Sequence, residues 1–63
     1  MIKLTHENGK ALYINLEKIE SFIRGYEYTE VYFSGESWWN VKETPEEIVE
    51  IINEQHRSNH NSV

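Results

Sequence analysis

The chain opens with an alternation of apolar and polar residues that predicts a β-hairpin. Residues 2–5 read Ile-Lys-Leu-Thr, the period-2 pattern of a half-buried strand, and a second apolar run follows at residues 11–15. Between these runs stands Asn8-Gly9, a pair that a two-residue type I′ turn prefers because both turn residues need positive φ. We therefore expect two antiparallel strands joined by a two-residue loop.

A two-residue loop also fixes which side chains share a face of this hairpin. In that register Glu7 lies opposite Lys10, and Tyr13 falls on the face of the apolar residues of the first strand. Leu12 and Ile14 then take the other face. Because both faces would hold apolar residues, we expect the sheet to curl into a barrel, to be covered on both sides or to adhere to other molecules.

Three strand-like segments follow between residues 19 and 42. The apolar positions of residues 19–24 do not share one parity, which a β-bulge or a late strand start would reconcile. Residues 28–33 are rich in β-branched and aromatic residues and give the clearest strand pattern. An odd-length loop with left-handed Gly35 would return the chain along residues 37–42. The predicted inner face then carries Val31, Phe33, Trp39 and Val41, and the other face Tyr32, Trp38 and Asn40.

Residues 44–57 predict the single helix of the chain. Thr44-Pro45-Glu46-Glu47 is a capping box with proline at the first helical position. The residues that follow form an apolar stripe wide enough to cover one sheet face: Ile48, Val49, Ile51 and Ile52. We expect the helix to end near Gln55–Arg57 and residues 58–63 to form a disordered tail.

These elements predict one small α+β domain over residues 1–57. Its expected architecture is a curled, four- to five-stranded antiparallel sheet, which can close toward a barrel, with one C-terminal helix on a face. A chain of 63 residues without cysteine has only a small core and neither a disulfide nor a thiolate zinc site to stabilise it.

The charge pattern argues against nucleic acids as partners. The formal net charge is −5, and all eleven acidic residues are Glu. The six Lys and Arg residues are scattered, so they form no basic stripe that could displace phosphate counterions. No apolar run approaches the length of a membrane span, and the N-terminus does not resemble a signal peptide. We expect an acidic, soluble, cytoplasmic protein that does not insert into membranes.

The residues that usually carry catalysis are scarce, and we expect no enzymatic activity and no cofactor. The chain has no Cys or Asp, and no glycine-rich phosphate loop precedes its helix. The capping box accounts for the pair Glu46-Glu47. His56 and His60 are spaced i, i+4, but no third ligand accompanies them, so we expect no metal site.

Aromatic residues are the feature that rises above this background. Tyr26, Tyr28, Tyr32 and Trp38 are close in sequence and fall on or near the face opposite the core, and Tyr13 of the first hairpin is a fifth candidate. Such residues could simply pair across strands. Tyr and Trp are also enriched in protein interfaces. Because one helix can cover only one sheet face, we expect these five residues to bind another protein or a second copy of this chain.

Several short segments between residue 1 and about residue 52 carry a family resemblance. They are Met1-Ile2-Lys3-Leu4-Thr5, Asn8-Gly9-Lys10, Asn15, Ile19-Glu20, Thr29-Glu30-Val31 and Val41-Lys42-Glu43-Thr44-Pro45-Glu46-Glu47-Ile48. Together they resemble the FlbD-type family of small bacterial flagellar proteins. The resemblance implies a non-enzymatic accessory protein of the flagellum, with no catalytic residues to carry over. Similar short chains in phage genomes leave open an alternative, a phage-encoded protein that binds and modulates a host protein or a phage complex.

Overall fold

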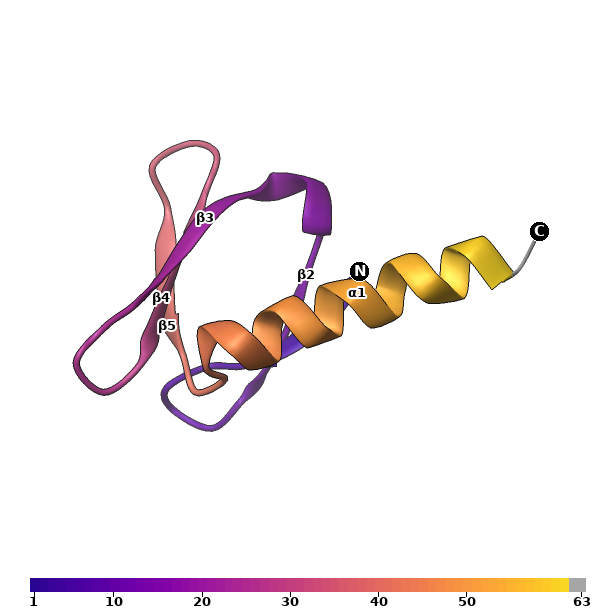
Figure 1. Ribbon diagram of the computed structural model, residues 1–63. Coiled ribbons are helices and arrows are strands. Elements are labelled where there is room, and N and C mark those ends of the chain that lie inside the picture. The colour runs from indigo at the N-terminus through magenta and orange to yellow at the C-terminus, as the bar shows by residue number, and fades with distance from the viewer. Residues whose placement is uncertain (62–63) are drawn as a thin grey trace.

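The computed structural model describes the backbone of residues 1–61 and the side chains of residues 1–57. Five strands and one long helix follow one another along the chain, with a short 3-10 helix between the first two strands and the other three (Figure 1). The elements are β1 (Ile2–Thr5), β2 (Ala11–Ile14), η1 (Leu16–Lys18), β3 (Ile19–Arg24), β4 (Thr29–Phe33), β5 (Trp38–Val41) and α1 (Pro45–Asn61). The predicted α+β class with one C-terminal helix is confirmed.

Strands β1 and β2 form the predicted hairpin, but its loop is one residue longer than predicted. The His6 N–H donates to the Lys10 carbonyl at 2.8 Å, and the Gly9 N–H donates to the His6 carbonyl at 2.8 Å. Three residues therefore make the turn, and Gly9 alone takes positive φ, at 92°. The Asn8 side chain accepts from the Lys10 N–H at 2.9 Å, which favours this longer turn.

This difference in loop length exchanges the side chains between the two faces of β2. Ile14 pairs with Ile2 and Leu12 with Leu4, so the apolar residues of both strands share one face. Tyr13 lies opposite Lys3 on the other face and is exposed. The predicted register was wrong because a slip of one residue turns every side chain of a strand over. The hairpin has one apolar face, not two.

Strands β3, β4 and β5 form an antiparallel meander whose faces were predicted correctly. Val31 pairs with Trp39 and Tyr32 with Trp38, around a loop in which Gly35 has a φ of 89°. The pairing of β3 with β4 shifts between Ile19 and Ser21, which is the predicted bulge. The shift brings Ile19 and Phe22 to the core side of the sheet.

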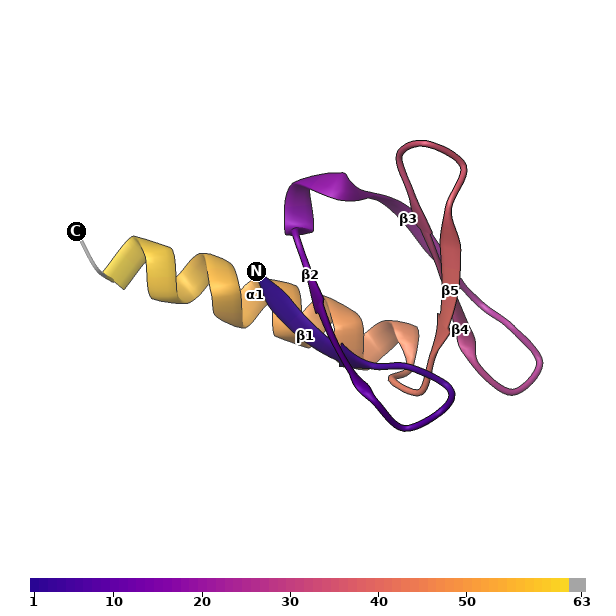
Figure 2. The same ribbon diagram turned by 180° about the vertical axis from the view of Figure 1, so that it is seen from behind.

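The five strands divide between two sheets, which corrects the prediction of one curled sheet. A single bridge, His6 to Val41, links the hairpin to β5 (Figure 2). Backbone bonds flank it from the Lys42 N–H to the Thr5 carbonyl at 2.8 Å and from the Glu7 N–H to the Asn40 carbonyl at 3.0 Å. Beyond them the chain turns into the loop after His6, so the ladder stops. No closed barrel forms within residues 1–61.

Helix α1 begins with the predicted capping box. The Glu47 N–H donates to Thr44 Oγ1 at 3.1 Å, and the Thr44 N–H donates to Glu47 Oε1 at 2.8 Å. The helix packs across β1 and β3 and continues to Asn61, beyond the predicted end near Arg57. The predicted disorder of residues 62 and 63 lies outside the described residues.

The core lies between the inner faces of the two sheets and the helix. Its buried apolar residues are Ile2, Leu4, Ile14, Val31, Val41 and Ile48. Two residues expected in it are instead exposed. Val49 lies about 100° around the helix from Ile48, on a flank that meets neither sheet. Trp39 is on the inner face, but the helix packs on β1 and β3 and leaves this part of β5 open.

Glu43 connects both sheets to the start of the helix. Its carboxylate accepts from the Thr5 N–H and the Thr5 hydroxyl, both at 2.8 Å. Its backbone carbonyl accepts from the hydroxyl of Thr29, a buried residue of β4, at 2.6 Å. One residue of the β5–α1 connection thus bonds to β1 and to β4, and it fixes where α1 begins relative to both sheets.

We expect Glu43→Gln to lower the free energy of unfolding by about 1–3 kcal/mol, because the amide replaces one charged acceptor with a donor facing Thr5. Urea denaturation followed by circular dichroism measures this change. Glu50→Gln, an exposed helix position, is the matched control and should change the free energy by less than about 0.5 kcal/mol. Equal effects of the two variants would contradict the role of Glu43.

Candidate protein-binding surface

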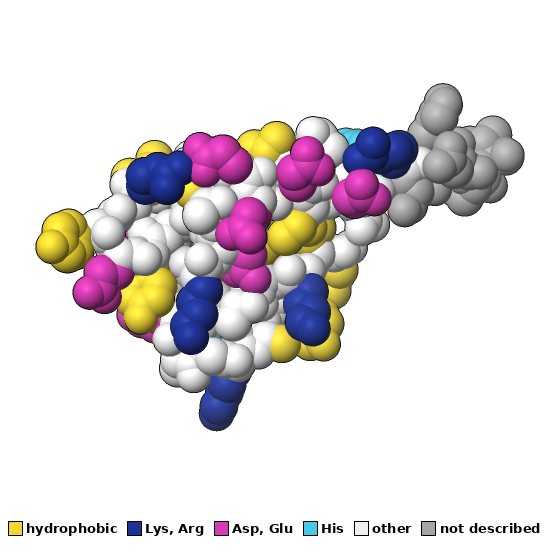
Figure 3. All heavy atoms as spheres, turned by 60° about the horizontal axis from the view of Figure 1, so that its bottom comes forward, with side chains coloured by type: hydrophobic (Ala, Val, Ile, Leu, Met, Phe, Trp, Pro, Cys, Tyr) yellow, Lys and Arg dark blue, Asp and Glu magenta, His cyan; other side chains and the backbone are white. Residues whose placement is uncertain are grey.

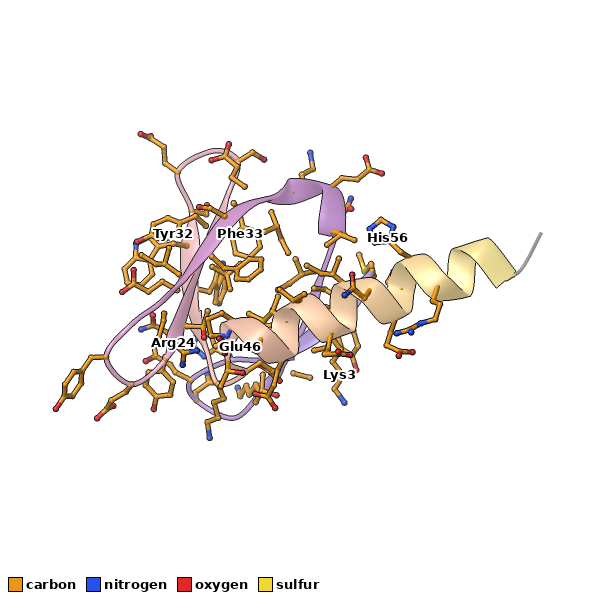
Figure 4. All side chains as sticks on the ribbon, viewed as in Figure 1. Lys3, Arg24, Tyr32, Phe33, Glu46 and His56 are labelled. Carbon is orange, nitrogen blue, oxygen red and sulfur yellow. The ribbon has the colours of Figure 1, made fainter. Side chains whose placement is uncertain are left out.

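The face of the β3–β4–β5 sheet that points away from the core carries two cross-strand rows of side chains. Asn40, Glu30 and Ile23 form one row across β5, β4 and β3, and Trp38, Tyr32 and Ser21 form the other. We call these six residues the outer face. Side chains alternate along a strand, so Tyr32 and Phe33 lie on opposite sides of β4 (Figure 4).

Tyr32 and Trp38 stack on each other at the centre of the second row. Their ring centroids are 6.2 Å apart, and the ring planes are inclined by 25°. The Phe33 N–H donates to the Ser37 carbonyl, so the neighbouring pair, Tyr32 and Trp38, is the non-hydrogen-bonded type in which opposing side chains lie closest. Trp38 is still 53% exposed. The stack is ordered within the sheet and largely open to solvent.

A hydrogen bond to Glu30 holds the Tyr32 ring in place. The Tyr32 hydroxyl donates to Glu30 Oε1 at 2.7 Å. This bond is the main reason that the pKa of Tyr32 is raised, and partial burial and the negative charge of Glu30 add to the shift. The same hydrogen bond joins the first row to the second through these two side chains.

A hollow of about 340 Å³ adjoins the outer face where the β3–β4 turn meets the β1–β2 loop. It is lined by Glu7, Tyr26, Glu27, Tyr28, Glu30 and Asn40. The Gly25 N–H donates to the Tyr28 carbonyl at 2.9 Å, which closes the turn. A Cβ at Gly25 would lie 2.5 Å from that carbonyl oxygen, so only glycine fits there. The tight turn places both tyrosines at the edge of the outer face.

The structure brings four of the five predicted interface residues to one region. Tyr32 and Trp38 belong to the outer face, and Tyr26 and Tyr28 line the adjoining hollow. Tyr13 lies elsewhere: it lines a separate groove of about 440 Å³ between β2 and the β4–β5 hairpin. The separation follows from the division into two sheets, since Tyr13 belongs to β2 and the other four residues belong to the β3–β4–β5 meander and its turn.

Sequence reasoning missed two residues of the region: Ile23 and Glu7. The β3 bulge moves Ile23 to the outer face, where it is 53% exposed. The Glu7 N–H bonds to the Asn40 carbonyl, and the Asn40 side chain donates to Glu7 Oε1 at 3.4 Å. Neither neighbour relation could be found without the bulge position and the contact between the two sheets.

A known protein family matches almost the whole chain. The family model of FlbD, described as flagellar and swarming motility proteins, matches residues 1–60. This chain belongs to the FlbD family. The match confirms the resemblance and extends beyond residue 52, and it places this FlbD-family chain among small motility-associated proteins. The searches of curated proteins and of solved structures found no significant match.

The described part of this FlbD-family chain contains neither a cluster of metal-ligating side chains nor a helix that could span a membrane. Within residues 1–57, no group of three or more His, Cys, Asp or Glu side chains is arranged to hold a metal ion. His60, half of the spaced histidine pair, lies outside the described side chains. Helix α1 is not apolar enough over its length to cross a membrane.

The bond between Tyr32 and Glu30 predicts how Tyr32 titrates. Tyr32 should titrate above its ordinary pKa of 10.0, and Glu30→Gln should bring the pKa down. Because folding raises this pKa, the stabilisation is complete below pH 10.0 and is lost as the pH rises through the raised value. The difference in tyrosinate absorbance between the natural chain and Tyr32→Phe isolates Tyr32. A Tyr32 that titrates at or below its ordinary pKa of 10.0 would contradict the bond.

Proposed function

We propose that this FlbD-family chain is a non-enzymatic, cytoplasmic accessory protein of flagellar motility that acts by binding another protein through its outer face. One observation carries the proposal: the stacked Tyr32–Trp38 pair lies on a sheet face that no helix or strand of the described chain covers. Its expected chemistry is recognition, without a metal or cofactor.

The composition of the outer face supports this function. Trp38 and Ile23 are each 53% exposed, and Tyr26 in the adjoining turn is fully exposed. Large apolar and aromatic side chains gathered in one region are typical of interaction sites, and Trp and Tyr are frequent hot-spot residues. The Glu30 hydrogen bond and the β-ladder hold the Tyr32–Trp38 stack in advance, so binding would cost little side-chain entropy.

The partner is either a flagellar protein or a second copy of this chain. A flagellar protein is favoured by the family match, and no observation favours the phage-encoded alternative. A second copy of the chain could also use the outer face, because a two-fold interface pairs a patch with itself. Light scattering of the purified chain distinguishes a self-associating protein from one that needs a different partner.

We expect Trp38→Ala to weaken partner binding by at least about tenfold, since truncating a hot-spot tryptophan costs about 2 kcal/mol or more. Affinity capture from cells of the source organism, together with the rate of swarming, measures the loss. Circular dichroism and the Tm should change little, because Trp38 lies outside the core.

Val49→Ala is the matched control, because Val49 is 46% exposed on the helix, away from the outer face. It should bind and swarm like the natural chain. Normal binding by Trp38→Ala would rule out the outer face as the interface. Unfolding of Trp38→Ala would show that Trp38 belongs to the folding core, which also contradicts the proposal.

A further inference from the structure

Three carboxylates and two tyrosines line the hollow beside the outer face, and no described Lys or Arg side chain lines it. Glu7, Glu27 and Glu30 line the hollow beside the outer face, together with two tyrosines and Asn40. Among the described residues, none of these carboxylates forms an ion pair with Lys or Arg. The region therefore combines a net negative charge with aromatic rings.

Of the described basic side chains, none lines this hollow, but two line its neighbour. Arg24 turns to the helix and pairs with Glu46, and this bond is the main cause of the lowered pKa of Glu46 (Figure 4). Arg24 and Lys42 line a neighbouring hollow beside Thr44, which shares Tyr26, Glu27 and Tyr28 with this one, and Lys18 lines the groove next to Trp39. On the side of the molecule that includes α1, positive and negative side chains are interspersed (Figure 3). Among its own lining residues, the hollow beside the outer face carries only negative charges.

We propose that this hollow binds a cationic side chain of the protein partner, with arginine as the best fit, while an apolar neighbour of that arginine packs on Tyr32 and Trp38. The inference rests on the proposed function and names the chemistry of the partner. A guanidinium group can stack on a tyrosine ring and donate two parallel hydrogen bonds to a carboxylate. The hollow offers both types of group within about 340 Å³.

The orientation of Glu30 favours this arrangement. Its Oε1 already accepts the Tyr32 hydroxyl at 2.7 Å, so the carboxylate is fixed and Oε2 can accept from an incoming donor. Glu7 approaches from the other side of the same hollow, held beside Asn40 by its backbone bond. A cation entering between them would meet carboxylates from two separate segments of the chain.

Charge also decides between this occupant and others. Three carboxylates repel the phosphates of nucleic acids and of anionic membranes. The carboxylates are not grouped to hold a metal ion among the described side chains, which favours a larger organic cation. A basic segment of a protein partner satisfies both the charge and the size of the hollow.

The test is a nuclear magnetic resonance titration of the full chain with two short peptides, acetyl-Arg-Leu-Arg-amide and acetyl-Gln-Leu-Gln-amide. We expect the arginine peptide alone to shift amide signals of residues 26–30 and 38–40 and of Glu7. Its binding should weaken as NaCl is raised from about 20 to about 300 mM, because salt screens exposed charges.

The variants Glu7→Gln and Glu30→Gln together should raise the Kd of the arginine peptide at least about fivefold. The matched control combines Glu17→Gln and Glu50→Gln, which removes the same charge from exposed positions elsewhere and should change the Kd by less than about twofold, because distant charges are screened. Comparing the two peptides on the natural chain needs no variant, so a folding defect cannot hide the answer.

Three results would overturn the inference: equal shifts with both peptides, equal weakening in the two double variants, or the same shifts on concentrating the chain without peptide. The last would make a second copy the occupant. If the arginine peptide does not bind while Trp38→Ala still loses its partner, the cationic partner is wrong and the proposed function stands.

Discussion

The packing of helix α1 across β1 and β3 is the contact on which the rest of the structure depends. Ile48 inserts between the two sheets, and the core that forms around it contains few buried side chains. A chain of this size buries only about 60% of its unfolded surface. The helix and the two inner faces bury one another, so no described element remains to cover the outer face. An open aromatic face follows from having a single helix.

Hydrogen bonds at the start of the helix keep this arrangement in register. The capping box of Thr44 sets where α1 begins, and Glu43 ties that point to Thr5 and Thr29. The same connection holds the end of β5 beside His6, where the hairpin meets the meander. The hollow beside the outer face lies across this junction, since Glu7 comes from the β1–β2 loop and Glu30 from β4. The junction between the hairpin and β5 therefore serves both the fold and the candidate site.

Local signals predicted the start of the helix, which the capping box sets, and the β4–β5 hairpin, whose loop contains left-handed Gly35. Each of these signals acts over only a few residues. The predicted register of the first hairpin was wrong because Asn8-Gly9 suits both two- and three-residue loops. The one extra loop residue decided which face of β2 carries Tyr13. The exposure of Trp39 depended on where the helix packs, which no local pattern contains. The candidate site was found through its aromatic residues, whereas the position of Glu7 depended on the contact between the sheets.

Photo-crosslinking in cells of the source organism tests most directly whether the outer face is where this protein meets its partner. A benzoylphenylalanine at Ile23, an exposed outer-face position, should give a discrete crosslinked product. The same group at Val49, which is similarly exposed on the helix, should give none. A product from Val49 with none from Ile23 would mean that the partner binds the helix and that the open sheet face has another purpose.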